Sequence, residues 1–174
     1  MGVMRAKFEI ECGDFEVNLA LESAPLTAGY FHDLILRRAF DGASIFRIVS
    51  LDNASIRTEC PIEVIQGGLK DSDPQPIAPI SHESTNQTGL PHKKWTLSTA
   101  RFNPGETYGS FFVCMRDEPA LDYGGGRHPD GLGFAAFGEV ISGFATLDAI
   151  FACQEPKVFL KNELRIRSAT LVAV

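Results

Sequence analysis

The sequence predicts a mainly β protein in which many short strands form a barrel or a sandwich, with helices covering parts of it. Short runs of alternating apolar and polar residues recur along the chain, separated by turns rich in Gly, Pro, Asn and Asp. Only two stretches have helical spacing instead. The 174 residues are expected to form a single domain, 1–174, because they suffice for a sizeable core and no repeat, low-complexity segment or linker divides them.

The chain begins with a predicted β-hairpin. Residues 5–10 and 15–21 alternate between apolar and polar side chains, and a glycine-containing turn lies between them. A helix of about fourteen residues follows. Ser23 or Thr27 is available as its cap, and the turn residues Asp41-Gly42 mark its end.

The middle of the chain alternates between strands and loops. Residues 45–49 form an apolar strand that carries one arginine, and residues 50–61 are polar and irregular. Residues 62–65 resume as a strand, which we expect to end in the turn Gln66-Gly67-Gly68. The proline-rich residues 71–79 have no periodicity and are expected to wrap over a neighbour as an ordered loop.

Two adjacent aromatic residues stand out in the next pair of strands, 96–100 and 110–115, which Asn103-Pro104-Gly105 joins. Neighbours on a strand point to opposite faces, so one ring of Phe111 and Phe112 enters the core and the other faces outward. An outward ring beside a polar loop is suited to floor a binding groove. The alternative is that both faces of the sheet are covered and both rings are core residues.

The last third of the chain repeats the pattern. A glycine-rich loop is predicted over residues 118–132, a strand over 134–140, a short helix over 142–151 and a closing strand over 164–174.

Composition excludes several classes of function. A formal net charge of −6, without a long basic run, argues against nonspecific nucleic-acid binding. No apolar segment reaches membrane-spanning length, and the N-terminus lacks the apolar segment of a signal peptide. Cys12, Cys60, Cys114 and Cys153 have no spacing typical of zinc or dithiol sites. We therefore expect reduced thiols, no metal, a cytoplasmic location and a monomer.

Common catalytic signatures are few. Gly124-Gly125-Gly126 does not lie between a strand and a helix, so it is interpreted as a loop and not as a phosphate site. The pair His82-Glu83 is weak support for acid–base chemistry, and Cys114 is interpreted as a core thiol. The histidines are interpreted as surface or helix residues; they are His32, His82, His92 and His128.

Arg47 is the candidate that the pattern singles out. An arginine on an apolar strand must either find acceptors or face a solvent-lined groove, because its guanidinium does not lose its charge. One interpretation is a structural arginine at the barrel edge that pairs with a carboxylate. The other is a functional arginine in a groove, and this strand alone does not decide between them.

Short motifs follow one another along nearly the whole chain. In order they are Ala24-Pro25-Leu26-Thr27, Phe40-Asp41-Gly42, Ile45-Phe46-Arg47-Ile48-Val49, Ile65-Gln66-Gly67-Gly68, Leu97-Ser98-Thr99-Ala100-Arg101, Gly109-Ser110-Phe111-Phe112, Ala120-Leu121-Asp122 and Phe134-Ala135-Ala136-Phe137-Gly138. In this order and spacing they resemble the cyclophilins, the cyclosporin-binding class of peptidyl-prolyl cis–trans isomerases, and most closely their bacterial branch.

The resemblance implies a closed barrel of about eight antiparallel strands with a helix at either end and a substrate groove on the outer face. It also implies a reaction that needs no cofactor. Carried over by position, Arg47 is the expected catalytic residue and Gln66 the residue that binds the substrate backbone. The other expected substrate-binding residues are Phe112, Val64 and Leu121 in a proline pocket, Phe134 at its rim, and Ala100, Arg101 and Ser110.

The chain departs from the family pattern at several positions near that groove. Phe46 stands where the family has a histidine, and Glu63 where it has an aromatic residue. Ser110 stands in place of a glutamine, and Ala120 in place of a tryptophan or phenylalanine. Residues 50–61 and 123–132 are longer than the family's connections, and both flank the expected groove.

Two functions are compatible with these residues. One is an isomerase that acts on X–Pro bonds of proline-containing peptides and unfolded proteins, and Arg47 with Phe112 favours it. The other is a peptide-binding module of the same fold with little catalysis, which Glu63 and Ser110 leave open. Because Ala120 replaces an indole, cyclosporin binding is expected to be weak.

Overall fold

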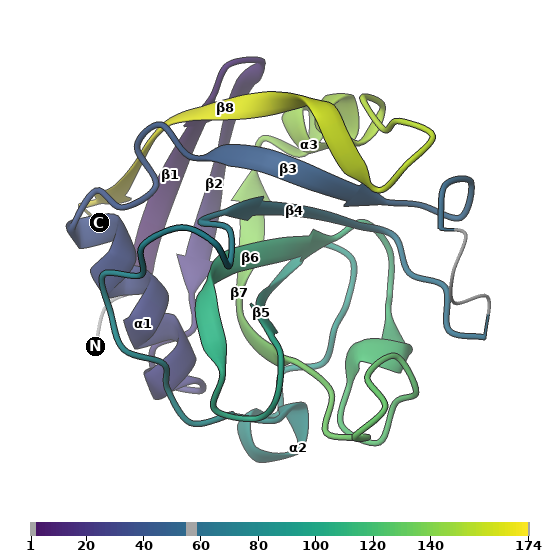
Figure 1. Cartoon of the computed structure of the whole chain (residues 1–174). Helices are drawn as coiled ribbons and strands as arrows, with labels where there is room; N and C mark the ends of the chain where they lie inside the picture. Colours follow the sequence, from purple (N-terminus) through teal and green to yellow (C-terminus); the bar gives the residue numbers. More distant parts are fainter. Residues whose placement is uncertain (1–2, 55–58, 174) are drawn as a thin grey trace.

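Eight antiparallel strands close into one barrel in the computed structural model, which describes residues 3–54 and 59–173 (Figure 1). The strands are β1 (Met4–Ile10), β2 (Gly13–Leu19), β3 (Ser44–Val49), β4 (Val64–Gly68), β5 (Thr96–Arg101), β6 (Thr107–Cys114), β7 (Ala135–Ser142) and β8 (Phe159–Val172). Around the barrel they follow the order β1-β2-β7-β5-β6-β4-β3-β8. The predicted mainly β fold and the closed eight-stranded barrel are confirmed.

The helices are α1 (Pro25–Leu36), α2 (Thr85–Thr88) and α3 (Phe144–Phe151), with one 3₁₀ turn at Pro119–Leu121. Two helices were expected, and α2 is additional. This single turn begins at a capping box, in which Ser84 and the side chain of Gln87 satisfy each other's backbone N–H groups. Both α1 and α3 bury apolar side chains in the barrel core.

A long-range contact caps α1. Neither Ser23 nor Thr27 supplies the cap as predicted; the N-cap position is Ala24, which makes no side-chain hydrogen bond. Instead, Glu83 Oε1 accepts hydrogen bonds from both the backbone N–H and the hydroxyl of Thr27, each at 2.7 Å. A carboxylate suits this place because the first turn of a helix has free N–H donors and a partial positive charge. The structure therefore gives Glu83 a structural role, and its pairing with His82 is not a catalytic dyad.

Glycine extends β4 beyond its predicted end. The stretch Gln66-Gly67-Gly68 was expected to be a turn, but it pairs with both β3 and β6. A Cβ on Gly67 would lie 2.6 Å from Ile45 Cδ1, and one on Gly68, whose φ is +102°, would lie 2.6 Å from the Gly109 carbonyl oxygen. These two glycines therefore let the neighbouring strands pack closely instead of ending the strand.

Two other strands begin earlier than predicted. β6 starts at Thr107 and β8 at Phe159. The first half of β8 is mostly exposed, so it lacks the apolar alternation by which a half-buried strand is recognised.

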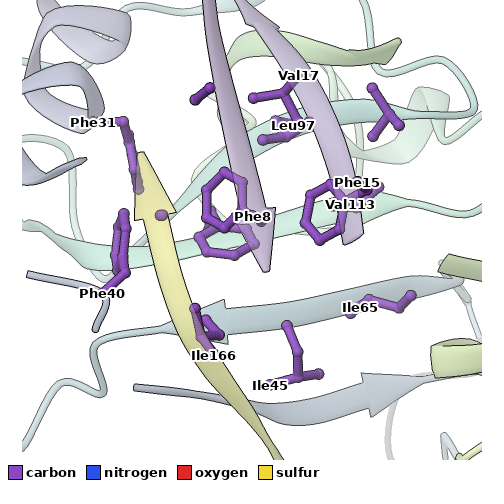
Figure 2. Packing of buried hydrophobic residues seen from close by; sticks show 14 of the residues in the cluster. Phe8, Phe15, Val17, Phe31, Phe40, Ile45, Ile65, Leu97, Val113 and Ile166 are labelled. Atoms are coloured by element: carbon purple, nitrogen blue, oxygen red, sulfur yellow. The ribbon is translucent and has the colours of Figure 1, made fainter. Parts of the chain in front are cut away.

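Phenylalanine rings dominate the barrel interior (Figure 2). Phe8 stacks on Phe15 at 5.0 Å between ring centroids, and Phe31 of α1 stacks on Phe137 at 4.1 Å. Phe111 is fully buried and contacts Phe8 at 5.1 Å. Phe111 therefore lies in the core, as the alternation along its strand predicted.

Candidate functional site

A second apolar cluster lies on the outside of the barrel, separate from its core. Along β6, Phe111 and Val113 belong to the core, whereas Phe112 and Cys114 belong to this second cluster. The same alternation on β4 places Ile65 inside and Val64 outside. The outer cluster therefore follows from the two-residue period of two neighbouring strands.

The outer cluster floors a cavity of about 370 Å³. Its lining includes every predicted site residue except Ser110. The lining residues are Arg47, Ile62, Val64, Gln66, Ala100, Arg101, Tyr108, Phe112, Leu121, Arg127, His128, Pro129 and Phe134. The structure thus brings together residues that the resemblance selected from six separate parts of the sequence.

Arg47 reaches this cavity from an irregular part of β3. The register of β3 shifts between Ile45 and Arg47, so Phe46 has no partner in the ladder with β4. The Arg47 Nη1 donates to Gln66 Oε1 at 3.0 Å, and its Nε–H is buried without a hydrogen-bond partner in the described part of the chain. The guanidinium carbon lies 5.6 Å from the ring centroid of Phe159.

The electrostatic surroundings of Arg47 do not match a structural ion pair. Within residues 3–54 and 59–173 the side chain of Arg47 donates a hydrogen bond to a neutral amide, Gln66, and forms no ion pair with a carboxylate. Burial, followed by the positive charge of Arg127, lowers the pKa of Arg47. A half-buried guanidinium without a carboxylate partner keeps donors available for a ligand, which favours the functional interpretation over the structural one.

Ser110 fixes the orientation of the Gln66 side chain from a buried position outside the cavity lining. Gln66 Nε2 donates to Ser110 Oγ at 2.9 Å, and this hydroxyl donates in turn to the Gly67 carbonyl at 3.3 Å. Ser110 is fully buried and does not line the cavity. Because the amide nitrogen is held by Ser110, the amide oxygen faces Arg47.

The apolar end of the cavity is built around Phe112. The ring of Phe134 meets it edge-on, with centroids 5.7 Å apart and planes at 87°, and Leu121 and Val64 are buried in the same cluster. Ile62 supplies a further wall that the sequence analysis missed. Glu63 replaces the aromatic residue that the family has at this position. Other residues thus provide the apolar wall that such an aromatic residue would have supplied.

Arg101 lines the cavity with its hydrogen-bonding capacity already used. Its guanidinium bonds both carboxylate oxygens of Asp130 at 2.9 and 3.0 Å, and it also donates to the carbonyl oxygens of Gly133 and Phe102. These contacts engage all five N–H donors of the side chain. They hold the pKa of Asp130 down at about 2. Arg101 therefore anchors the loop of residues 123–132 beside the cavity.

That loop adds residues that the sequence analysis did not expect at the site. Arg127, His128 and Pro129 line the cavity, and His128 Nε2 hydrogen-bonds the Phe102 carbonyl at 2.9 Å. The extra length of the loop was the only signal in the sequence. Tyr108 was missed because β6 was expected to begin after it; burial raises the pKa of its phenol.

The expectation for the histidines was wrong for His92. His92 is neither at the surface nor in a helix: it is buried, bonded to Asp122 and Ser98, and stacked on Phe112. His128 lies in the cavity loop. Among the described residues no group of three or more His, Cys, Asp or Glu side chains is placed to hold a metal ion. None of the described helices has both the length and the apolar character needed to cross a membrane.

Comparison with known proteins places this arrangement in context. Residues 5–171 match the sequence model of the family described as cyclophilin type peptidyl-prolyl cis-trans isomerase/CLD. A peptidyl-prolyl cis-trans isomerase from Acinetobacter baylyi is 29% identical over 142 residues, which are 79% of this chain and 66% of that protein. The isomerase cyp18 of Streptomyces antibioticus is 31% identical over 131 residues, 73% of this chain and 70% of its own length.

The fold has close structural counterparts as well. A crystal structure of a cyclophilin type isomerase from Cryptosporidium parvum superposes with a TM-score of 0.78 at 16% identity, covering 99% of both chains. A second structure of that protein, obtained in the presence of the dipeptide Ala-Pro, also gives 0.78, at 17% identity over 98% of this chain and 99% of the other.

Proposed function

The chain belongs to the cyclophilin-type peptidyl-prolyl cis–trans isomerase family, and we propose that it accelerates X–Pro rotation with Arg47 as the donor to the prolyl nitrogen. The observation that carries this proposal is the Arg47 guanidinium. It lies on the wall of a cavity whose floor is the outer apolar cluster, is half-buried without a carboxylate partner among the described residues, and retains an unpaired Nε–H.

The chemistry requires only such a donor. The barrier to rotation is ~18–20 kcal/mol because the C–N bond has partial double-bond character. At the twisted state the lone pair returns to the prolyl nitrogen, which becomes a better hydrogen-bond acceptor than in the planar amide. A guanidinium placed against this nitrogen therefore binds the transition state more tightly than the ground state.

The surrounding residues have complementary tasks in this proposal. Phe112, Leu121 and Val64 hold the proline ring, with Phe134 at the rim and Ala100 beside it. Gln66 binds the peptide backbone and orients Arg47, and Ser110 acts on the substrate only through Gln66. Arg101 shapes the cavity by holding residues 123–132, since its own donors are engaged.

The proposed partners are proline-containing peptides and unfolded chains, bound by a monomer in the cytoplasm. The dipeptide Ala-Pro in one related structure supports the class of ligand. The four cysteines are free thiols, which fits a reducing compartment. No nucleic acid, metal or cofactor enters the proposal.

A protease-coupled isomerase assay on a short X–Pro peptide panel tests the proposal. Arg47→Ala is expected to fold and to lower kcat/KM by roughly 10²–10³-fold, the loss typical of one transition-state donor. Arg47→Lys is expected to recover little, because a point charge does not reproduce the planar fork. The exposed Arg5 on β1 provides the matched control, and Arg5→Ala should retain native turnover.

Two results would contradict this proposal. Near-native turnover by Arg47→Ala would show that the arginine is structural. Binding of the peptides by the native protein without acceleration would favour the second candidate, a peptide-binding module, for which the substitutions Glu63 and Ser110 remain the supporting observation.

A further inference from the structure

A second cavity of about 440 Å³ is also lined by Arg47. Arg47, Gln66 and Tyr108 line both cavities, so the two cavities adjoin one another at these residues. The remaining residues of the second cavity are Phe46, Lys70, Asp71, Phe102, Phe159, Leu160 and Glu163. None of these was expected to contact a substrate.

Aromatic side chains give this second cavity an apolar character at the surface. Phe159 is 63% exposed and Phe102 is 51% exposed, which is uncommon for phenylalanine. Both rings line the same cavity, and Phe102 also stacks on Tyr108 with centroids 5.2 Å apart. Exposed apolar rings grouped in a concave site next to a reaction centre are typical of a binding surface.

The charges of the cavity argue against a charged occupant. The cations Arg47 and Lys70 are balanced by the carboxylates of Glu163 and Asp71, and Lys70 Nζ lies 2.8 Å from Glu163 Oε2. The faces of two rings already have cation partners from the protein itself. Arg47 lies 5.6 Å from the centroid of Phe159, and Lys70 Nζ lies 5.8 Å from that of Phe46. An incoming Lys or Arg would meet these like charges, whereas a neutral ring would not.

We infer that the second cavity is a subsite for an aromatic side chain, and this inference rests on the proposed function. The aromatic residue belongs to the same peptide whose proline occupies the first cavity. The cavities meet at Arg47 and Gln66, so a peptide seated there passes directly from one to the other. The subsite therefore favours client peptides that carry an uncharged aromatic side chain next to the X–Pro bond in their own sequence.

The test is a set of peptides that differ in one side chain. A reference with alanine on both sides of the X–Pro unit is compared with peptides carrying Phe, Leu, Lys or Glu at one position before or after it. We expect Phe at one of these positions to raise kcat/KM about three- to ten-fold over alanine, the size of one aromatic contact. Lys and Glu at that position should give no gain.

Substitutions of residues that line the second cavity test whether these residues cause the preference for Phe. Phe159→Ala and Phe102→Ala should each bring the ratio of kcat/KM for the Phe and Ala peptides close to one. Taking this ratio within each variant removes any change in basal turnover. Phe144 is exposed on α3 and outside both cavities, so Phe144→Ala is the matched control and should keep the native ratio. Phe159→Glu should shift the preference from Phe to Lys, because it adds a carboxylate.

The outcomes separate this inference from the proposed function. If the reference peptide is isomerised but Phe raises kcat/KM at no position, the subsite is overturned and the isomerase proposal stands. A gain that persists in both Phe159→Ala and Phe102→Ala would place the aromatic site elsewhere and would also overturn it. If no peptide is isomerised, the isomerase proposal fails, and peptide affinities measured by calorimetry still decide whether Phe is preferred.

Discussion

The carboxylate of Asp122 accepts two hydrogen bonds from His92, one from its backbone N–H at 2.8 Å and one from Nδ1 at 2.7 Å. An ionised carboxylate only accepts, so Nδ1 donates, and Nε2 forms a hydrogen bond with the hydroxyl of Ser98 at 2.8 Å. The imidazole also stacks on Phe112, with centroids 6.1 Å apart. This pair connects the two walls of the proposed proline pocket, because Asp122 follows Leu121 in the chain.

Removing this connection should destabilise the protein. Burial by itself would raise the pKa of Asp122, but the bonds from His92 hold it below its usual value, so the carboxylate is ionised at neutral pH. Asp122→Ala leaves two donors of His92 unpaired and is expected to cost roughly 1–3 kcal/mol in the free energy of unfolding. Urea denaturation measures this cost. The exposed Asp148→Ala on α3 is the control, and an equal loss in both variants would contradict the assignment.

The neighbouring rings of β6 should give opposite phenotypes. Phe111 lies in the core, so Phe111→Ala is expected to cost roughly 3–5 kcal/mol of stability, with less effect on peptide affinity. Phe112 lines the cavity, so Phe112→Ala should raise KM and lower kcat more than it lowers the melting temperature. Calorimetry and the isomerase assay on both variants check this pair, and exchanged phenotypes would show that the binding site is not on the outer face.

The ion pair between Arg101 and Asp130 should make stability depend on pH in the acid range. Hydrogen bonds from Arg101 lower the Asp130 pKa to about 2, against an ordinary value of 3.8. A lowered folded-state pKa stabilises the protein fully above the unfolded-state value, and this contribution disappears as the pH falls from about 4 towards 2. The difference in melting temperature between the native protein and Asp130→Asn should therefore be present at pH 6 and shrink near pH 2. A constant difference across this range would show that the pair contributes no pH-dependent stability.

Cyclosporin is expected to bind weakly. Ala120 occupies the position at which the resemblance expects an indole, and an alanine provides neither the ring contact nor the N–H donor. Together these losses should cost about 2–4 kcal/mol, or roughly thirty-fold to several hundred-fold in affinity. Trp95 does not replace the indole, because it packs against Phe144 outside the cavity. Titration of the drug into the isomerase assay measures the effect, and inhibition at nanomolar concentration would contradict it.

The parts predicted well depend on strand alternation and on the family resemblance. The two faces of β6 follow from the order of Phe111 and Phe112. The number of short strands predicted a barrel or a sandwich, and the resemblance implied the closed barrel that the structure has. The parts missed depend on contacts between distant segments. Nothing local to Glu83 indicates that it caps α1, and nothing local to His92 indicates that Asp122 and Ser98 surround it.

The cavity lining shows the same division. Residues within recognisable motifs, such as Gln66 and Leu121, line the cavity. Residues of the long loop, such as Pro129, were not, because the path of a loop is set by its anchors and not by its own periodicity. Here the anchor is the pairing of Arg101 with Asp130, which joins residues 29 positions apart.

The cap of α1 by Glu83 has a consequence for synthesis at the ribosome. Thr27 and Glu83 are 56 positions apart in the sequence. The nascent chain therefore exposes α1 well before the carboxylate that completes its first turn has been made. At about 5–20 residues per second, this interval lasts several seconds. The β1–β2 hairpin needs no later residue to close its own ladder. Translation therefore presents the hairpin as a locally completed unit, while the first turn of α1 stays uncapped until Glu83 has emerged and reached Thr27.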